Sequence, residues 1–370
     1  MSDTKNHNIV AKIIYFTITV INIIVAIPLL VATLSKYIDP TQFALPSLLS
    51  LAFVELFIVN VFFVVLWLFT SKRVCCLISL ITILIAMRPL MQTFNFKSNQ
   101  TTSFETDNRL KILTYNTLRT GKRLKPEKNE VIKYIQQSNA DIVFMQEYEE
   151  SKNIPHIKKA DIIKALKDYT YHQTQFRISN KGRDFGVAIY SKYPLFNKHN
   201  IEFESAYNGA FYCDAAVGND TIRLICAHLE SNQITGIELD EPMEGAKSQN
   251  AQQVSTGAKV IINKLISAYK IRSIQAKEIA KIVNNSPYKI ILCGDFNDVP
   301  QGYCYNTIAN TLVDSFSEAG PHGFGNTFKR KWLHVRIDYI LHSKEMKACN
   351  FHIDKNEGSD HYPVYCTIGW

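Results

Sequence analysis

The chain has 370 residues, enough for two domains, and its 41 basic and 33 acidic residues give a formal net charge of +8. Half of this excess lies in the first 104 residues, which are mostly apolar, so the rest of the chain is nearly neutral. Such a balance lacks the dense basic patches that are typical of nucleic-acid-binding proteins. None of the eight cysteines forms a C-x-x-C pair, which argues against a structural zinc site.

Three apolar segments fill the first part of the chain, and we predict that residues 1–93 form three transmembrane helices. The segments cover about residues 13–34, 44–70 and 74–93. The first has no charged residue and is long enough to cross a bilayer. It is longer than the apolar core of a usual signal peptide and lacks an obvious small-residue cleavage site, so we favour a membrane helix over a cleaved signal.

Two charged residues inside these segments need an explanation, because a charge within a bilayer is costly. Glu55 lies in the second segment and Arg88 lies in the third. We consider two alternatives for Glu55: an ion pair with Arg88, or a protonated side chain that faces a neighbouring helix. Arg88 lies near the end of its segment, where a long side chain can reach the polar interface.

The basic residues beside the segments predict how the chain is oriented in the membrane. Lys5, Lys12, Lys72 and Arg73 flank the segments on one side and outnumber the basic residues on the other. Since positive residues are retained in the cytoplasm, this bias predicts a multi-pass plasma (inner) membrane protein. Its N-terminus is expected to be cytoplasmic and its remaining domain to lie outside the cytoplasm.

The polar residues 94–108 are predicted to form a linker, and residues 109–370 to form one further domain. Strands are expected at residues 110–117, 141–148, 171–176, 185–191, 211–217, 221–229, 288–296, 336–343 and 362–368. Helices are expected at residues 130–137, 160–169 and 248–284. Runs of strands between blocks of helix predict an α/β layered domain with mixed sheets.

Several of the predicted strands end in a carboxylate, an amide or an imidazole. These residues are Asn116, Glu147, His228, Asp295, Asn297, Asp338, Asp360 and His361. Taken singly, an Asp or Asn after a strand is more often a turn residue or a helix cap than a ligand. Together, carboxylate and amide oxygens suit Mg²⁺ or Mn²⁺, and two histidines beside them suit a phosphate oxyanion.

Six motifs carry a resemblance to a known family. In chain order they read "TYN", "DIVFMQE", "AHLES", "GDFND", "RIDYIL" and "GSDHYPV". In this order they resemble the endonuclease/exonuclease/phosphatase superfamily, the DNase I-like metal-dependent phosphoesterases, over residues 109–370. The resemblance implies an α+β fold class: a four-layer α/β/β/α sandwich, here preceded by the bundle of three transmembrane helices.

The resemblance also implies a metal site at the strand ends. Glu147 would be the principal carboxylate on a divalent metal, either Mg²⁺ or Mn²⁺. Asn116 would lie close to that metal, and Asp360 would be a further ligand. Asp298, at the end of "GDFND", is expected to be a turn residue instead.

Five residues would carry the catalysis if the resemblance holds. Asp295 would orient or deprotonate the attacking water, and Asn297 would help to hold the water and the phosphate. His361 would donate to the phosphate oxygens, and Asp338 would accept from the other nitrogen of His361. His228 would contact the phosphate from the opposite side or protonate the leaving oxygen. Gly294 is expected to let the chain turn without blocking the phosphate.

The substrate class is less defined by the sequence. Abasic-site repair endonucleases commonly carry an acid two residues after the asparagine matched by Asn116, where this chain has Leu118. "AHL" around His228 is more similar to the DNase I, sphingomyelinase and inositol phosphatase branches. The favoured hypothesis is therefore a membrane-anchored phosphodiesterase or phosphatase that acts on a lipid headgroup outside the cytoplasm.

Two other hypotheses were considered for the same motifs. The alternative enzyme is a membrane-tethered nuclease that acts on extracytoplasmic DNA or RNA. A catalytically inactive binding module is disfavoured, because every expected catalytic position is filled. No protein partner is predicted.

Overall fold

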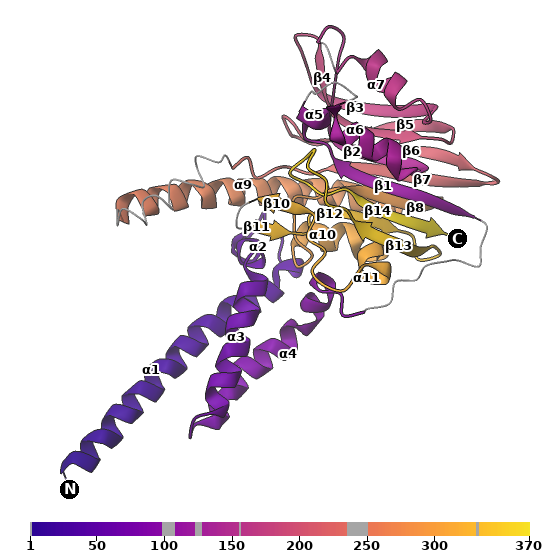
Figure 1. Cartoon of the computed structure of the whole chain (residues 1–370). Helices are drawn as coiled ribbons and strands as arrows, with labels where there is room; N and C mark the ends of the chain where they lie inside the picture. Colours follow the sequence, from indigo (N-terminus) through magenta and orange to yellow (C-terminus); the bar gives the residue numbers. More distant parts are fainter. Residues whose placement is uncertain (1, 98–107, 123–127, 155–156, 235–250, 331–332) are drawn as a thin grey trace.

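The computed structural model describes residues 2–97, 108–122, 128–154, 157–234, 251–330 and 333–370. An N-terminal helical part, residues 2–97, stands against one end of a layered α/β unit that we call the sandwich domain, residues 108–370 (Figure 1). The last described residue of the helical part and the first of the sandwich domain flank part of the predicted linker, whose residues 98–107 lie outside the described chain.

Three long helices make up most of the helical part. They are α1 (Ser2–Thr33), α3 (Phe53–Leu68) and α4 (Cys76–Thr93), joined through the short elements η1 (Ser35–Tyr37), α2 (Leu45–Ser50) and η2 (Arg73–Cys75). Two stretches, Ile9–Tyr37 and Arg73–Thr93, are long and apolar enough to cross a membrane. The structure therefore offers two candidate spans where the sequence predicted three.

The predicted second span, residues 44–70, is divided into two helices. α2 ends at Ser50, and α3 begins at Phe53 and has 16 residues. A helix of that length rises about 24 Å, less than the roughly 30 Å of a bilayer core. The division also changes the place of Glu55, which lies in the first turn of α3, near the sandwich domain, and not in mid-helix.

Of the two alternatives considered for Glu55, the ion pair with Arg88 is not present. Among the described residues no ion pair joins the two side chains, and both are exposed. The reason is the helix break before Phe53, which places Glu55 at the end of α3, where it lines a cavity against the sandwich domain.

The helical part buries a polar contact between its helices beside a small apolar core, and it carries large apolar side chains on its outside. The hydroxyl of Ser79 on α4 lies 2.9 Å from the side-chain oxygens of both Asn22 on α1 and Asn60 on α3. All three of these polar residues are fully buried, whereas large apolar side chains such as Phe16 and Leu84 are exposed. The apolar outside differs from that of a water-soluble bundle, which exposes polar side chains and turns its apolar stripe inward.

Two six-stranded mixed sheets form the centre of the sandwich domain. The first runs in the order β13 (Lys347–Ile353), β14 (Val364–Gly369), β1 (Arg109–Asn116), β2 (Ile142–Ser151), β4 (Arg183–Ser191) and β3 (Tyr171–Asn180). The second runs in the order β5 (Leu195–Ile201), β6 (Ala210–Val217), β7 (Asp220–His228), β8 (Lys289–Asp295), β12 (Asp338–His342) and β9 (Val313–Asp314). A separate hairpin pairs β10 (Phe328–Arg330) with β11 (Leu333–Val335).

The alternation of apolar residues along the strands places three cores between four layers. Ile112 and Phe144 of the first sheet pack with Leu224 and Cys293 of the second in the core between the sheets. The outer face of the first sheet packs against α6 (Glu130–Ser138) and α7 (Lys159–Ala165). The outer face of the second packs against α9 (Ala251–Asn284) and α10 (Tyr303–Ile308), and α11 (Ser315–Ala319) follows β9. The predicted four-layer sandwich is confirmed.

Some strands were not expected from the sequence. β5 and β13 each form an edge of a sheet, next to a strand that was predicted. Neither contains the continuous apolar run that marks a buried strand. In β5 five of the seven residues are exposed, so its pattern resembles a polar loop. Of the predicted helix 248–284, residues 248–250 lie outside the described residues.

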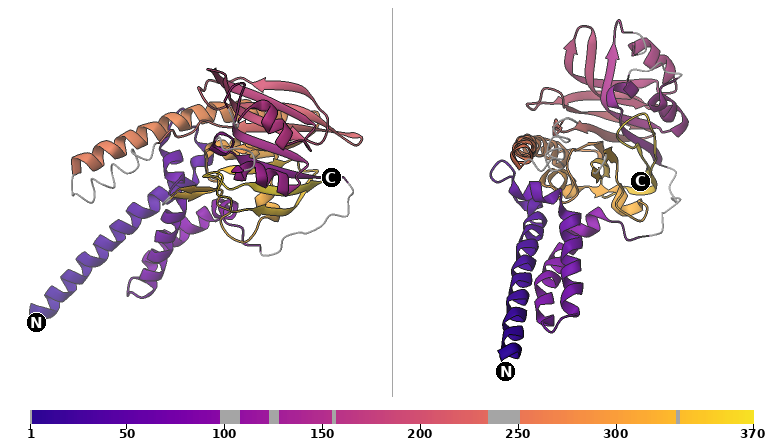
Figure 2. Two further views of the ribbon diagram at one scale, coloured as in Figure 1. Left: turned by 45° about the horizontal axis from the view of Figure 1, so that its top comes forward. Right: turned by 60° about the vertical axis from the view of Figure 1, so that its left-hand side comes forward.

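The helical part lies against the sandwich domain (Figure 2), and polar contacts join the two. Asp39, just after η1, forms an ion pair with Lys277 of α9 and accepts a hydrogen bond of 2.6 Å from Ser273. At the end of α4, the backbone oxygen of Gln92 accepts a hydrogen bond of 2.7 Å from the guanidinium of Arg336. The residues that were predicted as the start of a linker also contact the sandwich domain, since Asn95 pairs with Gly323 as a β-bridge.

Candidate active site

The strand ends singled out in the sequence meet at one edge of the two sheets. β1 and β2 are parallel, as are β7 and β8, so their carboxyl ends lie side by side. His228 and Asp295 are register partners at the ends of β7 and β8. β12 runs antiparallel to β8, and its first residue, Asp338, therefore lies opposite Asp295.

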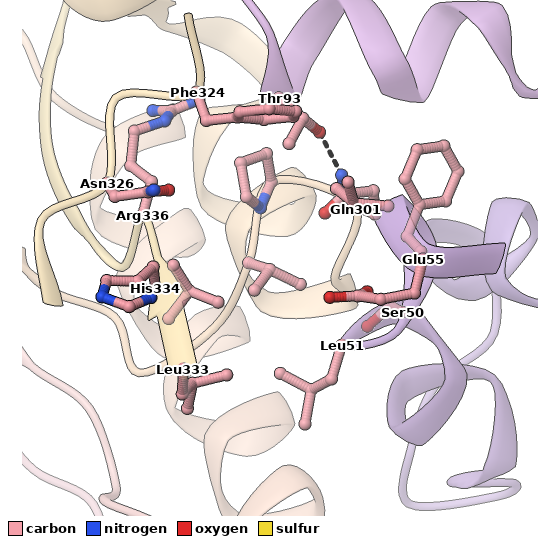
Figure 3. Close-up of a pocket in the computed structure, with 15 residues that line it drawn as sticks. Ser50, Leu51, Glu55, Thr93, Gln301, Phe324, Asn326, Leu333, His334 and Arg336 are labelled. Carbon is pink, nitrogen blue, oxygen red and sulfur yellow. Dashed lines mark hydrogen bonds between the residues drawn. The ribbon is translucent and has the colours of Figure 1, made fainter. Parts of the chain in front are cut away.

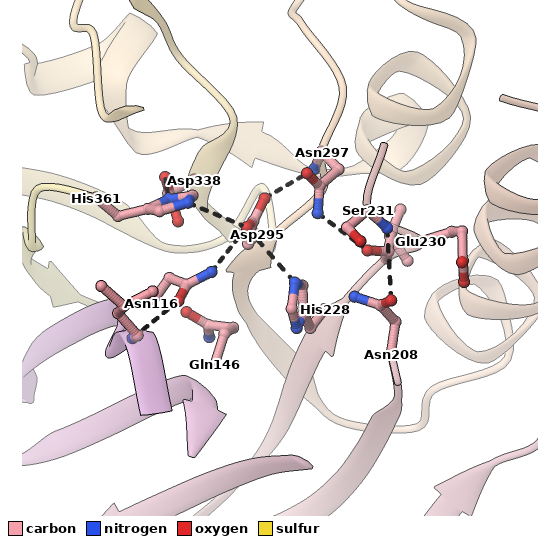
Figure 4. Close-up of polar contacts among 12 residues, drawn as sticks. Asn116, Gln146, Asn208, His228, Glu230, Ser231, Asp295, Asn297, Asp338 and His361 are labelled. Carbon is pink, nitrogen blue, oxygen red and sulfur yellow. Dashed lines mark hydrogen bonds and ion pairs between the residues drawn. The ribbon is translucent and has the colours of Figure 1, made fainter. Parts of the chain in front are cut away.

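Asp295 is the centre of the polar cluster (Figure 4). Its fully buried carboxylate accepts hydrogen bonds from Asn116 Nδ2 at 3.0 Å and from the backbone N–H of Asn297 at 2.8 Å. The Nε2 atoms of His228 and His361 each lie 3.7 Å from Asp295 Oδ2. Burial raises the pKa of Asp295, and the Asp338 carboxylate raises it further, while the two imidazoles act in the opposite direction.

His361 is held between two carboxylates. Its Nδ1 lies 2.9 Å from Asp338 Oδ2, and its Nε2 points toward Asp295. Burial by itself would lower the pKa of His361, but the Asp338 and Asp295 carboxylates outweigh it and raise the pKa to about 10. The ring also packs on Phe328 of β10, with the ring centroids 4.9 Å apart.

His228 has the opposite electrostatic character. Its burial lowers the pKa to about 4, although the neighbouring Asp295 carboxylate acts in the other direction. His228 is therefore neutral near pH 7 and His361 is protonated, so the two imidazoles differ in charge. Asn297 follows β8 and has a backbone φ of +50°. Its Nδ2 donates a hydrogen bond of 3.1 Å to the Leu229 carbonyl.

The position of Glu147 coincides with a break in the regular pairing of β2 with β4. The register of β2 against β4 shifts between Met145 and Tyr148, and Glu147 itself has φ of +51°. Burial raises the pKa of Glu147 to about 7; the Asp360 and Asp295 carboxylates add to this rise, which His361 and Arg119 oppose. Glu147 is thus a carboxylate whose ionisation the surrounding protein disfavours.

Asp360 interacts with the other candidate site residues through its charge; no hydrogen bond joins its side chain to them among the described residues. It is half-buried, and its carboxylate acts on both Glu147 and His361. Its backbone oxygen accepts from the N–H of Lys329 at 3.0 Å, which fixes the loop against β10. The structure thus brings all eight predicted residues to one edge, six of them in a contacting cluster and Glu147 and Asp360 beside it.

The cluster fits a divalent cation. Glu147, Asp360 and the side-chain oxygen of Asn116 supply hard oxygen ligands. Two observations favour a positive ion here: the pKa of Glu147 is raised, and Asp338 Oδ1 is buried with no hydrogen-bond partner among the described residues.

A second grouping of ligand atoms is also present. Asp295, Asp338 and His361 lie within 4.8 Å of one another, so they too have metal-ligand geometry. Both ring nitrogens of His361 already face carboxylates, however, which leaves no free lone pair for a metal. We therefore interpret this group as an oriented histidine.

Two residues beside the cluster have other roles. Asp298 accepts hydrogen bonds from the backbone N–H groups of Val299 and Cys304 and so holds the start of α10, in keeping with a turn residue. Gly294 was expected to let the chain turn at the end of the strand. This expectation is wrong, because Gly294 lies within β8. A Cβ atom there would come within 1.9 Å of the Ala227 backbone oxygen, so glycine permits the close approach of β7.

The turn after β1 has a strained backbone that sequence reasoning missed. Residues 118–121 of α5 (Leu118–Lys122) all have φ between +44° and +70°. The Thr120 hydroxyl and the Glu149 backbone exchange two hydrogen bonds of 2.9 Å, which hold the turn against β2. This turn presents Arg119 to the edge, where its positive charge lowers the pKa of Glu147. In the sequence of this turn, Gly121 is the one residue type that favours a positive φ.

Thr327 is a second residue that sequence reasoning missed. Its buried hydroxyl oxygen accepts from the backbone N–H groups of both Ile337 and Asp338 at 3.1 Å. Its backbone oxygen accepts from the N–H of Tyr362 at 2.6 Å. Thr327 therefore connects the segment that carries Asp338 to the loop that carries His361. A single threonine in a loop gives no signal of this role.

Asn208 is a third such residue. It lies next to Gly209, whose oxygen accepts from the His228 N–H at 2.9 Å, and its own side-chain oxygen lies 3.4 Å from the Ser231 N–H (Figure 4). It is buried at the start of β6, facing the loop that follows His228. An amide there can donate to an anion beside His228.

Comparison with known families agrees with the motifs. A model of the endonuclease/exonuclease/phosphatase family matches residues 113–361. A second model, described only as a domain of unknown function, matches residues 12–93. A comparison with curated proteins gives no match.

Several solved structures resemble the sandwich domain. An endonuclease/exonuclease/phosphatase from Beutenbergia cavernae has 15% identity and a TM-score of 0.49, covering 71% of this chain and 72% of its own. A family protein from Leptotrichia buccalis has 17% identity and a TM-score of 0.49, covering 70% of this chain and 100% of its own. The TDP2 protein of D. rerio, in complex with a single strand DNA product, has 16% identity and a TM-score of 0.47, covering 71% of this chain and 100% of its own.

Proposed function

This chain belongs to the endonuclease/exonuclease/phosphatase family, and we propose that it is a membrane-anchored, divalent-metal-dependent enzyme that hydrolyses a phosphodiester or phosphomonoester outside the cytoplasm. As a family member it is a phosphoric ester hydrolase. The observation that carries the more specific proposal is the buried cluster around Asp295, in which two carboxylates, two amides and two imidazoles contact one another.

Asp295 is proposed to accept the proton of the attacking water. Asn116 and the Asn297 N–H donate to its two carboxylate oxygens and so fix its orientation. Burial raises its pKa, which makes the carboxylate a stronger base than an exposed aspartate. The Asn297 side chain lies on the same edge and is proposed to hold the water and a phosphate oxygen.

The two histidines are proposed to act on the phosphate from different positions. His361, protonated and oriented through its Nδ1 by Asp338, donates from Nε2 to the phosphate oxygens as negative charge develops in the transition state. His228, which is neutral, contacts the phosphate from the side of β7. A neutral imidazole there can donate one hydrogen bond to the phosphate or to the leaving oxygen.

Glu147, Asn116 and Asp360 are proposed to hold Mg²⁺ or Mn²⁺. When bound, such an ion neutralises the phosphate oxygens and stabilises charge on the leaving oxygen. Arg119 lies near Glu147 and is proposed to attract the negatively charged phosphate of the substrate.

The proposal of a membrane anchor is supported by the apolar outside and the buried polar contacts of the helical part. Ser79 contacts both Asn22 and Asn60 inside the bundle, and large apolar side chains cover its outside. Interhelical contacts between small and polar side chains are typical of helices in lipid. The basic residues Lys72 and Arg73 lie between α3 and α4, at the end far from the sandwich domain, which favours an extracytoplasmic enzyme.

A substrate in the same membrane is proposed because the helical part is docked directly on the sandwich domain. The contacts of Asp39 with α9 and of Gln92 with Arg336 keep the enzyme near the membrane surface. A lipid headgroup is therefore the favoured phosphate ester.

The test is a hydrolysis panel on the full chain in detergent micelles with Mg²⁺. The substrates are bis-p-nitrophenyl phosphate, phospholipids, sphingomyelin, and single- and double-stranded DNA. We expect turnover of a lipid, loss of turnover with EDTA and its return with Mg²⁺ or Mn²⁺. The Asp295→Asn enzyme should be slower by about 10²–10⁴, as is common when a general base is lost.

Three results would change the proposal. Cleavage of DNA without lipid turnover would make the chain a tethered nuclease. Activity that survives EDTA would contradict the metal. Release of the protein from membranes by alkaline carbonate would contradict the anchor, independently of any activity.

A further inference from the structure

A cavity of about 250 Å³ lies between the helical part and the sandwich domain. One wall comes from α2, α3 and the end of α4, and the other from the loop after β8 and from β11 and its neighbours (Figure 3). None of the eight residues of the candidate active site lines it. It is therefore a separate site, placed at the level where the apolar helices meet the polar domain.

The helical wall carries a carboxylate that faces the cavity. Glu55 points its carboxylate toward the opposite wall in Figure 3, and among the described residues no side chain forms an ion pair with it. It is flanked in the sequence by the apolar residues Val54 and Leu56. The N-terminal end of α3 tolerates a negative charge in this turn, because the helix dipole is positive there. The cavity in front of the carboxylate favours a cation.

The opposite wall carries hydrogen-bond donors. His334 and Asn326 line it, and His334 on β11 is exposed (Figure 3). Arg336 also lines it, but its charge is already neutralised by Asp314, whose Oδ2 lies 2.7 Å from its Nη1. This wall can thus contact an anionic group through hydrogen bonds.

Apolar side chains complete the cavity next to these polar groups. Leu51 lies on the helical wall and Leu333 on the opposite one, and Leu333 is 42% exposed. A ligand that fits therefore has an ammonium group, an anion a short distance from it, and an apolar part. A headgroup in which an ammonium and a phosphate are joined to acyl chains has this sequence of groups.

We propose that this cavity binds the headgroup of a zwitterionic aminophospholipid, with its ammonium group against Glu55 and its phosphate toward His334 and Asn326. This inference rests on the proposed membrane anchor, since the lipid enters from the bilayer around the helices. The bound lipid holds the two parts of the molecule together. The segments that line the cavity, residues 299–301 and 333–336, lie within a few residues of Asn297 and Asp338, so the lipid also supports the loops of the active site.

The test measures lipid binding and not turnover. The full chain, purified in detergent micelles, is titrated with phosphatidylethanolamine or with phosphatidylglycerol, and its melting temperature and the lipid retained in native mass spectrometry are recorded. We expect phosphatidylethanolamine to raise the melting temperature and to be retained in preference to phosphatidylglycerol. Glu55→Gln should weaken phosphatidylethanolamine binding by about fivefold, the effect of one partly exposed charge pair.

Control variants separate the site from general effects. Glu202→Gln removes the same charge at a position whose side chain is 78% exposed in the sandwich domain, and should bind like the wild type. His334→Ala, on the other wall, should also weaken binding, and it keeps the test decisive if the Glu55 variant folds poorly. The melting temperature without lipid checks the folding of each variant.

The outcomes distinguish this proposal from the enzymatic one. Equal retention of the two lipids, preference for phosphatidylglycerol, or unchanged binding in both cavity variants would overturn the aminophospholipid site. The inactive Asp295→Asn protein should still bind phosphatidylethanolamine. A failure of hydrolysis would therefore leave the lipid result intact, and a failure of lipid binding would leave the hydrolysis result intact.

Discussion

Single side chains in this molecule connect the two loops that complete the active site. Asp338 orients His361 through its carboxylate, and its backbone N–H donates to Thr327. Thr327 in turn accepts from Ile337 and holds Tyr362, the neighbour of His361. The hydroxyl and carbonyl of one buried residue thus hold the segments of Asp338 and His361 together. In the proposed reaction Thr327 is a positioning residue, because it acts through these two segments.

Thr327→Val is expected to lower kcat by about tenfold while changing KM little. Valine keeps the shape but leaves two buried N–H groups without an acceptor, which costs about 1–3 kcal/mol and displaces Asp338. Steady-state kinetics on bis-p-nitrophenyl phosphate measure the two constants. Thr327→Ser retains the hydroxyl and should restore kcat. If serine and valine behave alike, the role of Thr327 is packing only.

At the scale of elements, the contact of α9 with the chain after η1 determines how the helical part is held. Asp39 receives hydrogen bonds from Ser273 and Lys277 on α9 and from the Thr41 N–H. Partial burial opposes the ionisation of Asp39, but these hydrogen bonds outweigh it and lower its pKa to about 2. The hydrogen bond with Asp39 likewise raises the pKa of Lys277. The ionised pair therefore favours the docked arrangement.

Asp39→Asn is expected to weaken the docking of the helical part by about 1 kcal/mol, since Lys277 stays partly exposed and water screens the pair. A double-mutant cycle with Lys277→Met, read out by thermal unfolding in detergent, measures the coupling. Because the pKa of Asp39 is lowered on folding, its contribution is complete above about pH 4 and disappears as the pH falls to about 2. Additive effects of the two variants would show that the pair contributes nothing.

At the scale of the whole molecule, the helical part and the sandwich domain form one docked unit. The end of α4 contributes Gln92 to Arg336 and Thr93 to Gln301. Beyond α4, the side chain of Asn95 donates to the carbonyls of Phe316 and Gly320. These contacts precede residue 98, so they do not depend on residues 98–107 remaining covalently intact.

A protease site inserted within residues 98–107 is expected to leave the molecule assembled after cleavage. The two fragments should co-elute in size-exclusion chromatography in detergent, because the polar contacts at the junction remain. A matched sample that carries Asn95→Ala and Arg336→Met loses several of these contacts and should separate more readily. Separation of the unsubstituted fragments would show that the helical part is a tether only.

The site was predictable at the level of residue identity and less so at the level of geometry. The eight side chains were named because each lies in or next to one of the six motifs and near one end of a predicted strand, and strand ends at one edge converge in any sheet of this topology. The positive φ of Glu147, the strained turn that carries Arg119 and the hydroxyl of Thr327 were not predicted. Each depends on a partner distant in the sequence: β4 for Glu147, Glu149 for the turn, and residues 337, 338 and 362 for Thr327.

The sequence alone determined the apolar helices, the alternating strands and the order of the motifs, because these follow from local periodicity and residue chemistry. Only the tertiary structure decided that the second apolar segment is two helices, that Glu55 faces a cavity instead of Arg88, and that the helical part is docked on the sandwich domain. These features arise from contacts between segments far apart in the chain. Local periodicity carries no information about such contacts, since the same apolar or polar residue satisfies many different partners.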